Sequence, residues 1–157
     1  MQLDVHVGVA TEDPQIDESQ QKHLLFSLKG ELYGTPLVSI REVLKLGPVK
    51  PVPYMSSHFS GIINLRGQIV SIIDLRVKFG LTNEAPPAGL VMVVETKSGV
   101  IGAVIDDLLC VKTIHPKDTE LHPNLDTRIP IKFYVGVAKT SFGLVSLIDV
   151  ASMLEER

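Results

Sequence analysis

Two aspartates and a small set of cysteine and histidine residues are the side chains of this sequence that could do chemistry. Asp74 and Asp149 stand in two nearly identical phrases, "VSIIDL" and "VSLIDV", and a pair of carboxylates could serve as general acid and base. Cys110 could be a nucleophile or, together with His115 and His122, a metal ligand. A small hydrolase and a metal site are therefore the first two possibilities to weigh.

The sequence around these residues favours structural roles instead. The spacing of Cys110, His115 and His122 matches no zinc module, and each histidine precedes a proline, which is typical of turns. We interpret Cys110 as a small buried thiol. The sequence contains no phosphate loop, dinucleotide fingerprint, nucleophile elbow or HExxH motif. We expect no enzymatic activity, no metal and no cofactor, and keep the hydrolase as an alternative.

Each aspartate has a structural explanation as a helix cap. A strand that stops at Asp can use the carboxylate to accept the free N–H groups of a helix's first turn. Asp74 would cap a short helix in "LRVKF" that ends near Gly80, and Asp149 would cap "VASMLEE". The two phrases are 75 residues apart, and earlier "YG" at 33–34 corresponds to "IG" at 101–102 after a gap. A duplicated small barrel explains both correspondences.

The elements that would carry these residues are predicted to be strands. From His23 onward, short runs rich in Val and Ile alternate with Gly-containing turns, a pattern typical of a β-barrel or sandwich. Hairpins are predicted around residues 29–30 and 97–99. The segment "TNEAPPAG", residues 82–89, is the best linker and divides the body into halves, 23–85 and 88–157. The sequence leaves open whether the halves exchange strands.

Composition narrows the class of protein. The 157 residues are 45% hydrophobic with a net charge of −3, and residues 1–22 form an acidic segment that we expect to be a disordered leader. The body has no Lys/Arg cluster and few aromatics, which argues against nucleic-acid binding. No apolar run is long enough to cross a bilayer, so no direct membrane insertion is expected. The single cysteine suits a reducing compartment, and we predict a cytoplasmic protein.

Arg66 is the unusual residue of the phrase "GIINLRGQIVSIIDLR", where it lies in a turn between two apolar strands. The plain interpretation is a solvated turn arginine. In the corresponding turn "AKTSFG", however, Ser141 takes its place, so a turn of this kind does not need arginine to fold. A guanidinium fork suits a carboxylate, and Glu42 in "SIREVL" could pair with Arg66 to order a docking surface.

At these residues the chain resembles the CheW family, the coupling proteins of bacterial chemotaxis arrays. The resemblance rests on "FSLKGELYGTPLVSIREVL", "PVPYMSSHFSGIINLRGQIVSIIDLRVKFGL", "VIGAVIDDLLCVKTI" and "YVGVAKTSFGLVSLIDVASML", and it covers most of residues 23–157. It implies two five-stranded SH3-like β-barrels packed around a shared core, with short helices after Asp74 and Asp149. It also implies a non-enzymatic adaptor in signal transduction, located in the cytoplasm beside membrane receptor arrays.

The resemblance implies two partners for such an adaptor. They are the regulatory domain of a CheA-like histidine kinase and the cytoplasmic tip of a methyl-accepting chemoreceptor. The matching positions for receptor binding are Ile40, Glu42, Gly61, Arg66, Leu90 and Leu108. The kinase-facing surface has no compact motif that transfers, and family members usually carry a polar or acidic residue in place of Cys110. A coupling protein of another chemosensory-like pathway, such as surface motility, is the alternative with the same fold.

Overall fold

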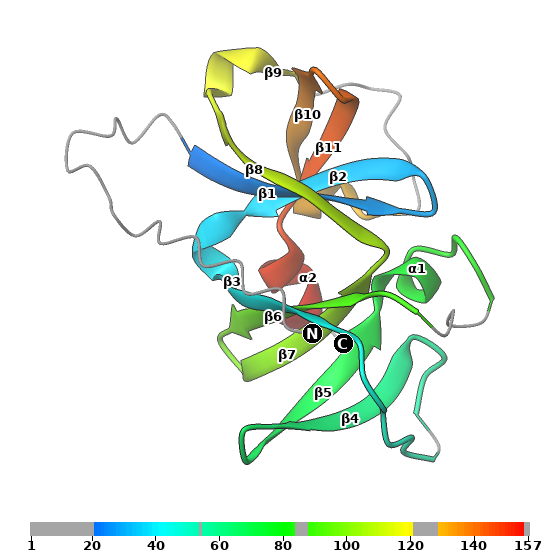
Figure 1. Ribbon diagram of the computed structural model, residues 1–157. Coiled ribbons are helices and arrows are strands. Elements are labelled where there is room, and N and C mark those ends of the chain that lie inside the picture. Colours follow the sequence, from blue (N-terminus) through cyan, green and yellow to red (C-terminus); the bar gives the residue numbers. More distant parts are fainter. Residues whose placement is uncertain (1–20, 54, 84–87, 121–128, 156–157) are drawn as a thin grey trace.

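The computed structural model describes residues 21–53, 55–83, 88–120 and 129–155, which form two β-sheets and a few short helices (Figure 1). The strands are β1 (Gln21–Leu28), β2 (Glu31–Pro36), β3 (Ile40–Lys45), β4 (Phe59–Leu65), β5 (Gln68–Asp74), β6 (Leu90–Thr96), β7 (Gly99–Ile105), β8 (Asp107–Ile114), β9 (Thr119–Glu120), β10 (Tyr134–Thr140) and β11 (Gly143–Ile148). The helices are α1 (Leu75–Lys78), α2 (Val150–Glu155) and the 3-10 turns η2 (Leu37–Ser39), η3 (Pro116–Asp118) and η4 (Ile131–Phe133). The predicted mainly β fold with short helices after the two aspartates is confirmed.

Two-residue turns close two of the hairpins. Lys29 and Gly30 join β1 to β2 with φ of 50° and 84°, and Arg66 and Gly67 join β4 to β5 with φ of 50° and 86°. Positive φ at both central positions is the type I′ geometry, whose twist matches that of the flanking strands. The hairpin predicted around residues 97–99 is also present, between β6 and β7.

Each sheet is built from strands of both sequence halves. One sheet has six strands in the order β8-β1-β2-β11-β10-β9, and the other has five in the order β3-β6-β7-β5-β4. The predicted halves, 23–85 and 88–157, therefore do not correspond to the two sheets. The exchange is reciprocal, because each sheet receives the first hairpin of the other half. The sixth strand, β9, is only two residues long and adds to the five strands that the resemblance implied.

A parallel pair of strands joins each exchanged hairpin to its new sheet. β2 runs parallel to β11 with Gly34 opposite Leu147, and β7 runs parallel to β5 with Gly102 opposite Ile72. The two pairs occupy corresponding places in the repeat, since Ile72 and Leu147 are equivalent residues of the twin phrases. The correspondence of "YG" with "IG" therefore marks the same position in both sheets.

Three apolar clusters stabilise this arrangement. The largest draws side chains from both sheets and from α2, which lies between the sheets in Figure 1. A second cluster lies within the five-stranded sheet and a third within the six-stranded sheet. Successive residues of β6 alternate between clusters, with Val91 in the second and Met92 in the shared one. This two-sided burial explains why runs such as "LVMVV" are continuously apolar.

The five-stranded sheet curls until its edges meet. Just after β3, Lys50 forms an antiparallel bridge with Ile62 of β4, through two backbone hydrogen bonds of 2.9 Å. Because β3 and β4 are the outer strands of the sheet order, this bridge closes the sheet into a barrel. Closure also brings β3 close to the β4–β5 turn, and this positions the candidate site.

Parts of the predicted leader and of the predicted linker lie outside the described residues. Residues 1–20 of the predicted leader lie outside the described residues, while Gln21 and Lys22 already belong to β1, where they pair with β8. The central four residues of the predicted linker 82–89, residues 84–87, also lie outside the described part. In the described ranges, every helix is too short or too polar to span a bilayer.

Candidate functional site

Arg66 and Glu42 form the ion pair that the sequence suggested. Arg66 Nη1 donates to Glu42 Oε2 at 2.6 Å and Nη2 donates to Oε1 at 2.8 Å, a two-pronged contact between the β4–β5 turn and β3. The Glu42 side chain is only 8% exposed, whereas that of Arg66 is 59% exposed. The buried carboxylate therefore orients an arginine side chain that is still largely exposed to solvent.

The local sequence explains how Glu42 comes to lie on the inner side of β3. The register between β3 and β6 shifts between Ile40 and Glu42, where Arg41 forms a β-bulge. A bulge redirects the side chains that follow it. Arg41 is exposed and pairs with Glu95 on β6, while Glu42 is buried and meets Arg66.

Electrostatics keeps Glu42 ionised despite its burial. The hydrogen bonds from Arg66 lower the pKa of the Glu42 carboxyl below its ordinary value of 4.5. Burial raises this pKa, but the positive charges of Arg66 and Arg41 act with the hydrogen bonds to lower it on balance. The pair is therefore fully charged at neutral pH.

Gly61 is required by the backbone around it. Its φ is +139°, and a Cβ built on it would come within 2.2 Å of the Lys50 carbonyl oxygen at the barrel closure. It also lies in a register shift between β4 and β5, and Gly136 occupies the matching shift between β10 and β11. Gly61 therefore allows β4 to approach the segment after β3. Its role at a receptor stays a prediction.

The three predicted apolar site residues are partly buried against the shared core. Ile40 lies opposite Val94 at one end of the β3–β6 pair, and Leu90 lies opposite Lys45 at the other end. Leu108 is on β8, in the other sheet. The structure thus brings Glu42 and Arg66 into contact, while Ile40, Leu90 and Leu108 are distributed around the junction of the sheets. A groove that they wall stays a prediction.

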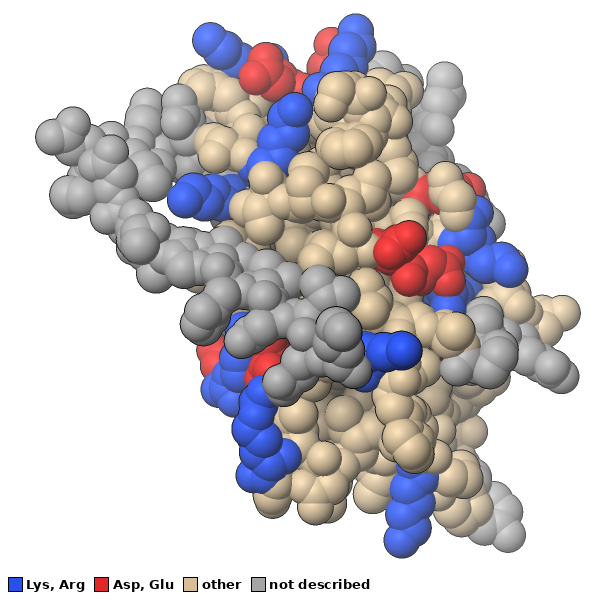
Figure 2. All heavy atoms as spheres, in the orientation of Figure 1, with Lys and Arg blue, Asp and Glu red and all other residues tan. Residues whose placement is uncertain are grey.

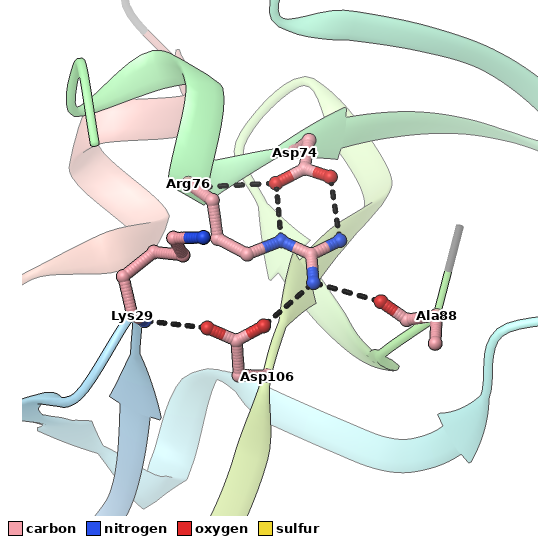
Figure 3. Close-up of polar contacts among 5 residues, drawn as sticks. All are labelled: Lys29, Asp74, Arg76, Ala88 and Asp106. Carbon is pink, nitrogen blue, oxygen red and sulfur yellow. Dashed lines mark hydrogen bonds and ion pairs between the residues drawn. The ribbon is translucent and has the colours of Figure 1, made fainter. Parts of the chain in front are cut away.

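The sequence prediction missed a buried charge network at this junction, drawn in Figure 3. The side chain of Arg76 is 1% exposed; its Nε and Nη2 donate to the two oxygens of Asp74 at 2.9 and 2.8 Å. Its Nη1 donates to Asp106 Oδ1 at 2.6 Å and to the Ala88 carbonyl at 2.7 Å. The other Asp106 oxygen accepts from the Lys29 amide at 2.5 Å. The sequence signal for this network was an arginine placed between two apolar residues, Leu75 and Val77, which indicates a charged side chain at a buried position.

The two repeated aspartates are helix caps, as predicted. Asp74 Oδ1 accepts from the Arg76 amide at 2.9 Å, and Asp149 Oδ1 accepts from the Ser152 amide at 3.1 Å. The remaining oxygen of Asp149 accepts from the Ser152 hydroxyl at 2.8 Å. Both carboxylates are thus engaged by their own helices, and Asp74 is buried as well. This arrangement does not suit the hydrolase alternative.

The cysteine and histidine set does not form a site in the described residues. Cys110 is partly buried on β8 beside the third cluster, and His115 Nδ1 accepts from the Lys117 amide at 3.2 Å at the start of η3. His122 lies outside the described residues. Within the ranges that the structure covers, three metal-ligating side chains come together nowhere.

Charge is dispersed on the face drawn in Figure 2. Lys and Arg side chains are scattered over this face, both at its rim and inside it, and acidic side chains lie beside several of them. Basic side chains on this face are therefore interspersed with acidic and uncharged ones.

Comparison with known proteins places this geometry among its relatives. The CheW-like domain family matches residues 22–157. The chemotaxis protein CheW of Helicobacter pylori is 28% identical over 157 residues, 99% of this chain and 92% of that protein. The chemotaxis protein CheW of Treponema pallidum is 24% identical over 147 residues, 90% of this chain and 86% of that protein.

Two further comparisons bear on fold and on pathway. The crystal structure of the scaffolding protein TtCheW from Thermoanaerobacter tengcongensis matches with a TM-score of 0.75 and 28% sequence identity, covering 88% of this chain and 90% of that one. Protein FrzA of Myxococcus xanthus is 27% identical over 140 residues, 87% of this chain and 86% of that protein. The likeness thus extends over both sheets.

Proposed function

This chain belongs to the family of CheW-like domains, and on that premise we propose that it is a non-enzymatic adaptor that couples chemoreceptors to a CheA-like histidine kinase in chemotaxis. The observation that carries the proposal is the Arg66–Glu42 pair. The Arg66–Gly67 turn, whose counterpart in the twin hairpin begins with Ser141, presents an arginine side chain that is 59% exposed and is oriented by a buried carboxylate. Such a fixed, exposed fork is suited to holding another protein.

The receptor partner fits this face as an amphipathic helix. The cytoplasmic tip of a methyl-accepting receptor would place its apolar stripe against Ile40, Leu90 and Leu108, with Arg66 and Glu42 fixing its orientation. Gly61 serves the same face by allowing β4 to approach the segment after β3. In this proposal, burial of apolar side chains supplies most of the affinity, and the charged pair fixes the position and direction of the receptor helix on this face.

An adaptor also needs separate docking faces, and both barrels expose apolar side chains. Ile69 on β5 and Leu144 on β11 occupy equivalent positions of the repeat, and each is 62% exposed. Phe142, beside Leu144 in the β10–β11 turn, is 49% exposed. Exposed apolar residues on opposite barrels support binding to more than one partner. The regulatory domain of the kinase is the second partner that we propose.

The proposal is tested on Arg66. Arg66→Ala and Arg66→Lys would be compared with wild type for binding to a receptor hairpin fragment and for receptor-dependent kinase activation, after circular dichroism confirms folding. We expect both variants to weaken receptor binding, because lysine cannot make the two-pronged contact. Lys139→Ala on the twin hairpin removes the same charge and is the control for receptor binding. Receptor binding and activation equal to wild type in both Arg66 variants would refute the role of this face.

A second candidate is a coupling protein of another chemosensory-like pathway, such as surface motility. FrzA, whose name does not mention chemotaxis, is 27% identical to this chain over 140 residues, a percentage close to the 28% of the Helicobacter pylori CheW. Deleting the gene and scoring swimming chemotaxis and surface spreading would separate the two. A fluorescent fusion that clusters at membrane receptor arrays only when receptors are present would support the proposed cytoplasmic, array-associated location.

A further inference from the structure

The chain passes from one sheet to the other at two equivalent places. It crosses from β2 to β3 through η2, and from β7 to β8 at Asp106. Because the strand exchange depends on these crossings, whatever fixes them also fixes how the two barrels face each other. The two crossings are fixed in different ways.

The first crossing is tied to α2 by a neutral hydrogen bond. Just before η2, Thr35 is fully buried, and its hydroxyl accepts from the Val150 amide at 3.2 Å. The second crossing is tied by charge. One carboxylate oxygen of Asp106 accepts from the Lys29 amide in the β1–β2 turn, and the other accepts from Arg76 of α1, which follows β5. The Asp106 amide donates to the Ser27 carbonyl at 3.1 Å.

Arg76 is the centre of this second tie. Its guanidinium holds three backbone segments at once, since it bonds Asp74 at the end of β5, the Ala88 carbonyl before β6, and Asp106 between β7 and β8 (Figure 3). A buried guanidinium without such partners would be strongly destabilising, so these contacts must be kept together. Lysine carries one point charge and cannot replace a planar fork at this place.

The segments held by Arg76 are those that carry two of the proposed receptor contacts. Leu90 follows Ala88 by two residues, and Leu108 follows Asp106 by two residues. The backbone around Gly89 is packed closely against the residue before Asp106 and against Arg76. A Cβ on Gly89 would come within 2.7 Å of the Ile105 carbonyl oxygen and 3.3 Å of Arg76 Nη1. A shift of the guanidinium would therefore move the backbone on both sides of the junction.

We propose that Arg76 is a positioning residue for the receptor face, which sets Leu90 of one sheet and Leu108 of the other at a fixed separation. The inference rests on the proposed function, because it assigns these leucines to receptor binding. According to this inference, Arg76 affects receptor binding although it is buried and does not contact the receptor itself. The inference also makes Asp106 the residue that ties the two barrels together at the second crossing.

The test uses Asp106→Asn and Arg76→Lys in the full chain, with Asp107→Asn as a control that removes the same charge from the exposed neighbouring residue. Asp106→Asn keeps the Asp74–Arg76 pair but replaces one acceptor by an amide donor that faces the Lys29 amide or Arg76. On one preparation of each variant, affinity is measured for a recombinant receptor hairpin fragment and for the kinase regulatory domain. Methyl NMR shifts of Leu90 and Leu108 are compared with those of Leu147.

We expect Asp106→Asn and Arg76→Lys to weaken receptor binding by about tenfold, which corresponds to about 1.4 kcal/mol, with kinase affinity changed less than about twofold. The methyl signals of Leu90 and Leu108 should shift while that of Leu147 stays in place. If Arg76→Lys does not fold, Asp106→Asn carries the test. Equal losses of receptor and kinase affinity, or unchanged receptor affinity, would overturn the inference.

Leu90→Ala separates this inference from the proposed function. If wild type does not bind the receptor fragment, the proposed function fails and the inference fails with it. If wild type binds and Leu90→Ala weakens binding, while both Asp106→Asn and Arg76→Lys bind like wild type, only the positioning role of Arg76 is overturned. Parallel loss in Leu90→Ala and Asp106→Asn supports the inference.

Discussion

Gly34 lies directly opposite Leu147 where β2 and β11 run parallel, and a Cβ built on Gly34 would come within 2.9 Å of Leu147 Cδ2. At the equivalent place in the other sheet, a Cβ on Gly102 would come within 2.6 Å of Ile72 Cδ1. The absence of a side chain at these two positions therefore lets each exchanged hairpin lie against its parallel partner.

Alanine at either glycine should destabilise the protein. Gly34→Ala and Gly102→Ala are each expected to lower the free energy of unfolding by roughly 1–3 kcal/mol, since the added methyl overpacks a filled core. Urea denaturation measures this. Gly47→Ala is the matched control: a Cβ there has no atom within 4 Å, and its effect should stay within about 0.5 kcal/mol. Equal effects at all three positions would contradict the packing argument.

The coupling between Glu42 and Arg66 should exceed that of a more exposed ion pair on the same sheet. A double-mutant cycle with Glu42→Gln and Arg66→Gln should give a stabilising coupling of up to about 1 kcal/mol, limited by the exposure of the arginine. The Arg41–Glu95 pair, with side chains 47% and 53% exposed, is the comparison. The coupling energy of Arg41 and Glu95 should be smaller. A larger value for that pair would contradict the claim that burial of Glu42 strengthens its pairing with Arg66.

The stabilisation by Glu42 should depend on pH in a defined direction. Hydrogen bonds from Arg66 lower the pKa of Glu42 in the folded protein, so the stabilisation is complete above the ordinary value of 4.5. It is lost as pH falls through the lower pKa of the folded state. The stability difference between wild type and Glu42→Gln, followed by urea unfolding, should therefore shrink on acidification. In an Arg66→Gln background this pH dependence should be weaker, and an unchanged one would exclude Arg66 as its main cause.

Replacing the two cap aspartates by alanine should lower the free energy of unfolding by different amounts. Asp149→Ala removes a cap and should lower the free energy of unfolding by about 0.5–2 kcal/mol. Asp74→Ala also leaves Arg76 buried without its two-pronged partner, and should cost about 3–5 kcal/mol. Thermal and chemical unfolding of the two variants provide the comparison. Similar losses in both would mean that the buried charge network contributes little.

Local features of the fold could be predicted because their signals lie close together in the chain. Strands follow from short apolar runs, the hairpins from their turn residues, and the caps at Asp74 and Asp149 from strand endings. The pairing of Arg66 with Glu42 was also accessible, because comparison with Ser141 drew attention to the arginine and a guanidinium fork suits a carboxylate. The comparison itself was inexact, since Arg66 and Gly67 have positive φ and the residues of the twin turn, Ser141 and Phe142, do not.

The strand exchange and the network of Arg76 were beyond such reasoning. Two halves with the same strand pattern can pair within themselves or across, and the apolar period is the same in both cases. Arg76 was interpreted only as a residue of the short helix that Asp74 caps, since Ala88 and Asp106 come near it only after folding. Gln21 and Lys22, which were expected to belong to the leader, are part of β1 for a related reason, because their partner is the distant strand β8.

The exchanged hairpins also set the order in which the protein can mature on the ribosome. Strands β3 to β7 are all present once Ile105 has been translated, so one barrel can close early. The apolar strand β1, although made first, cannot be covered on both edges of its hairpin until β8 and then β11, ending at Ile148, have emerged. The β1–β2 hairpin therefore stays without neighbours on its two edges until Ile148 has been made, and unpaired strand edges of this kind favour misassembly.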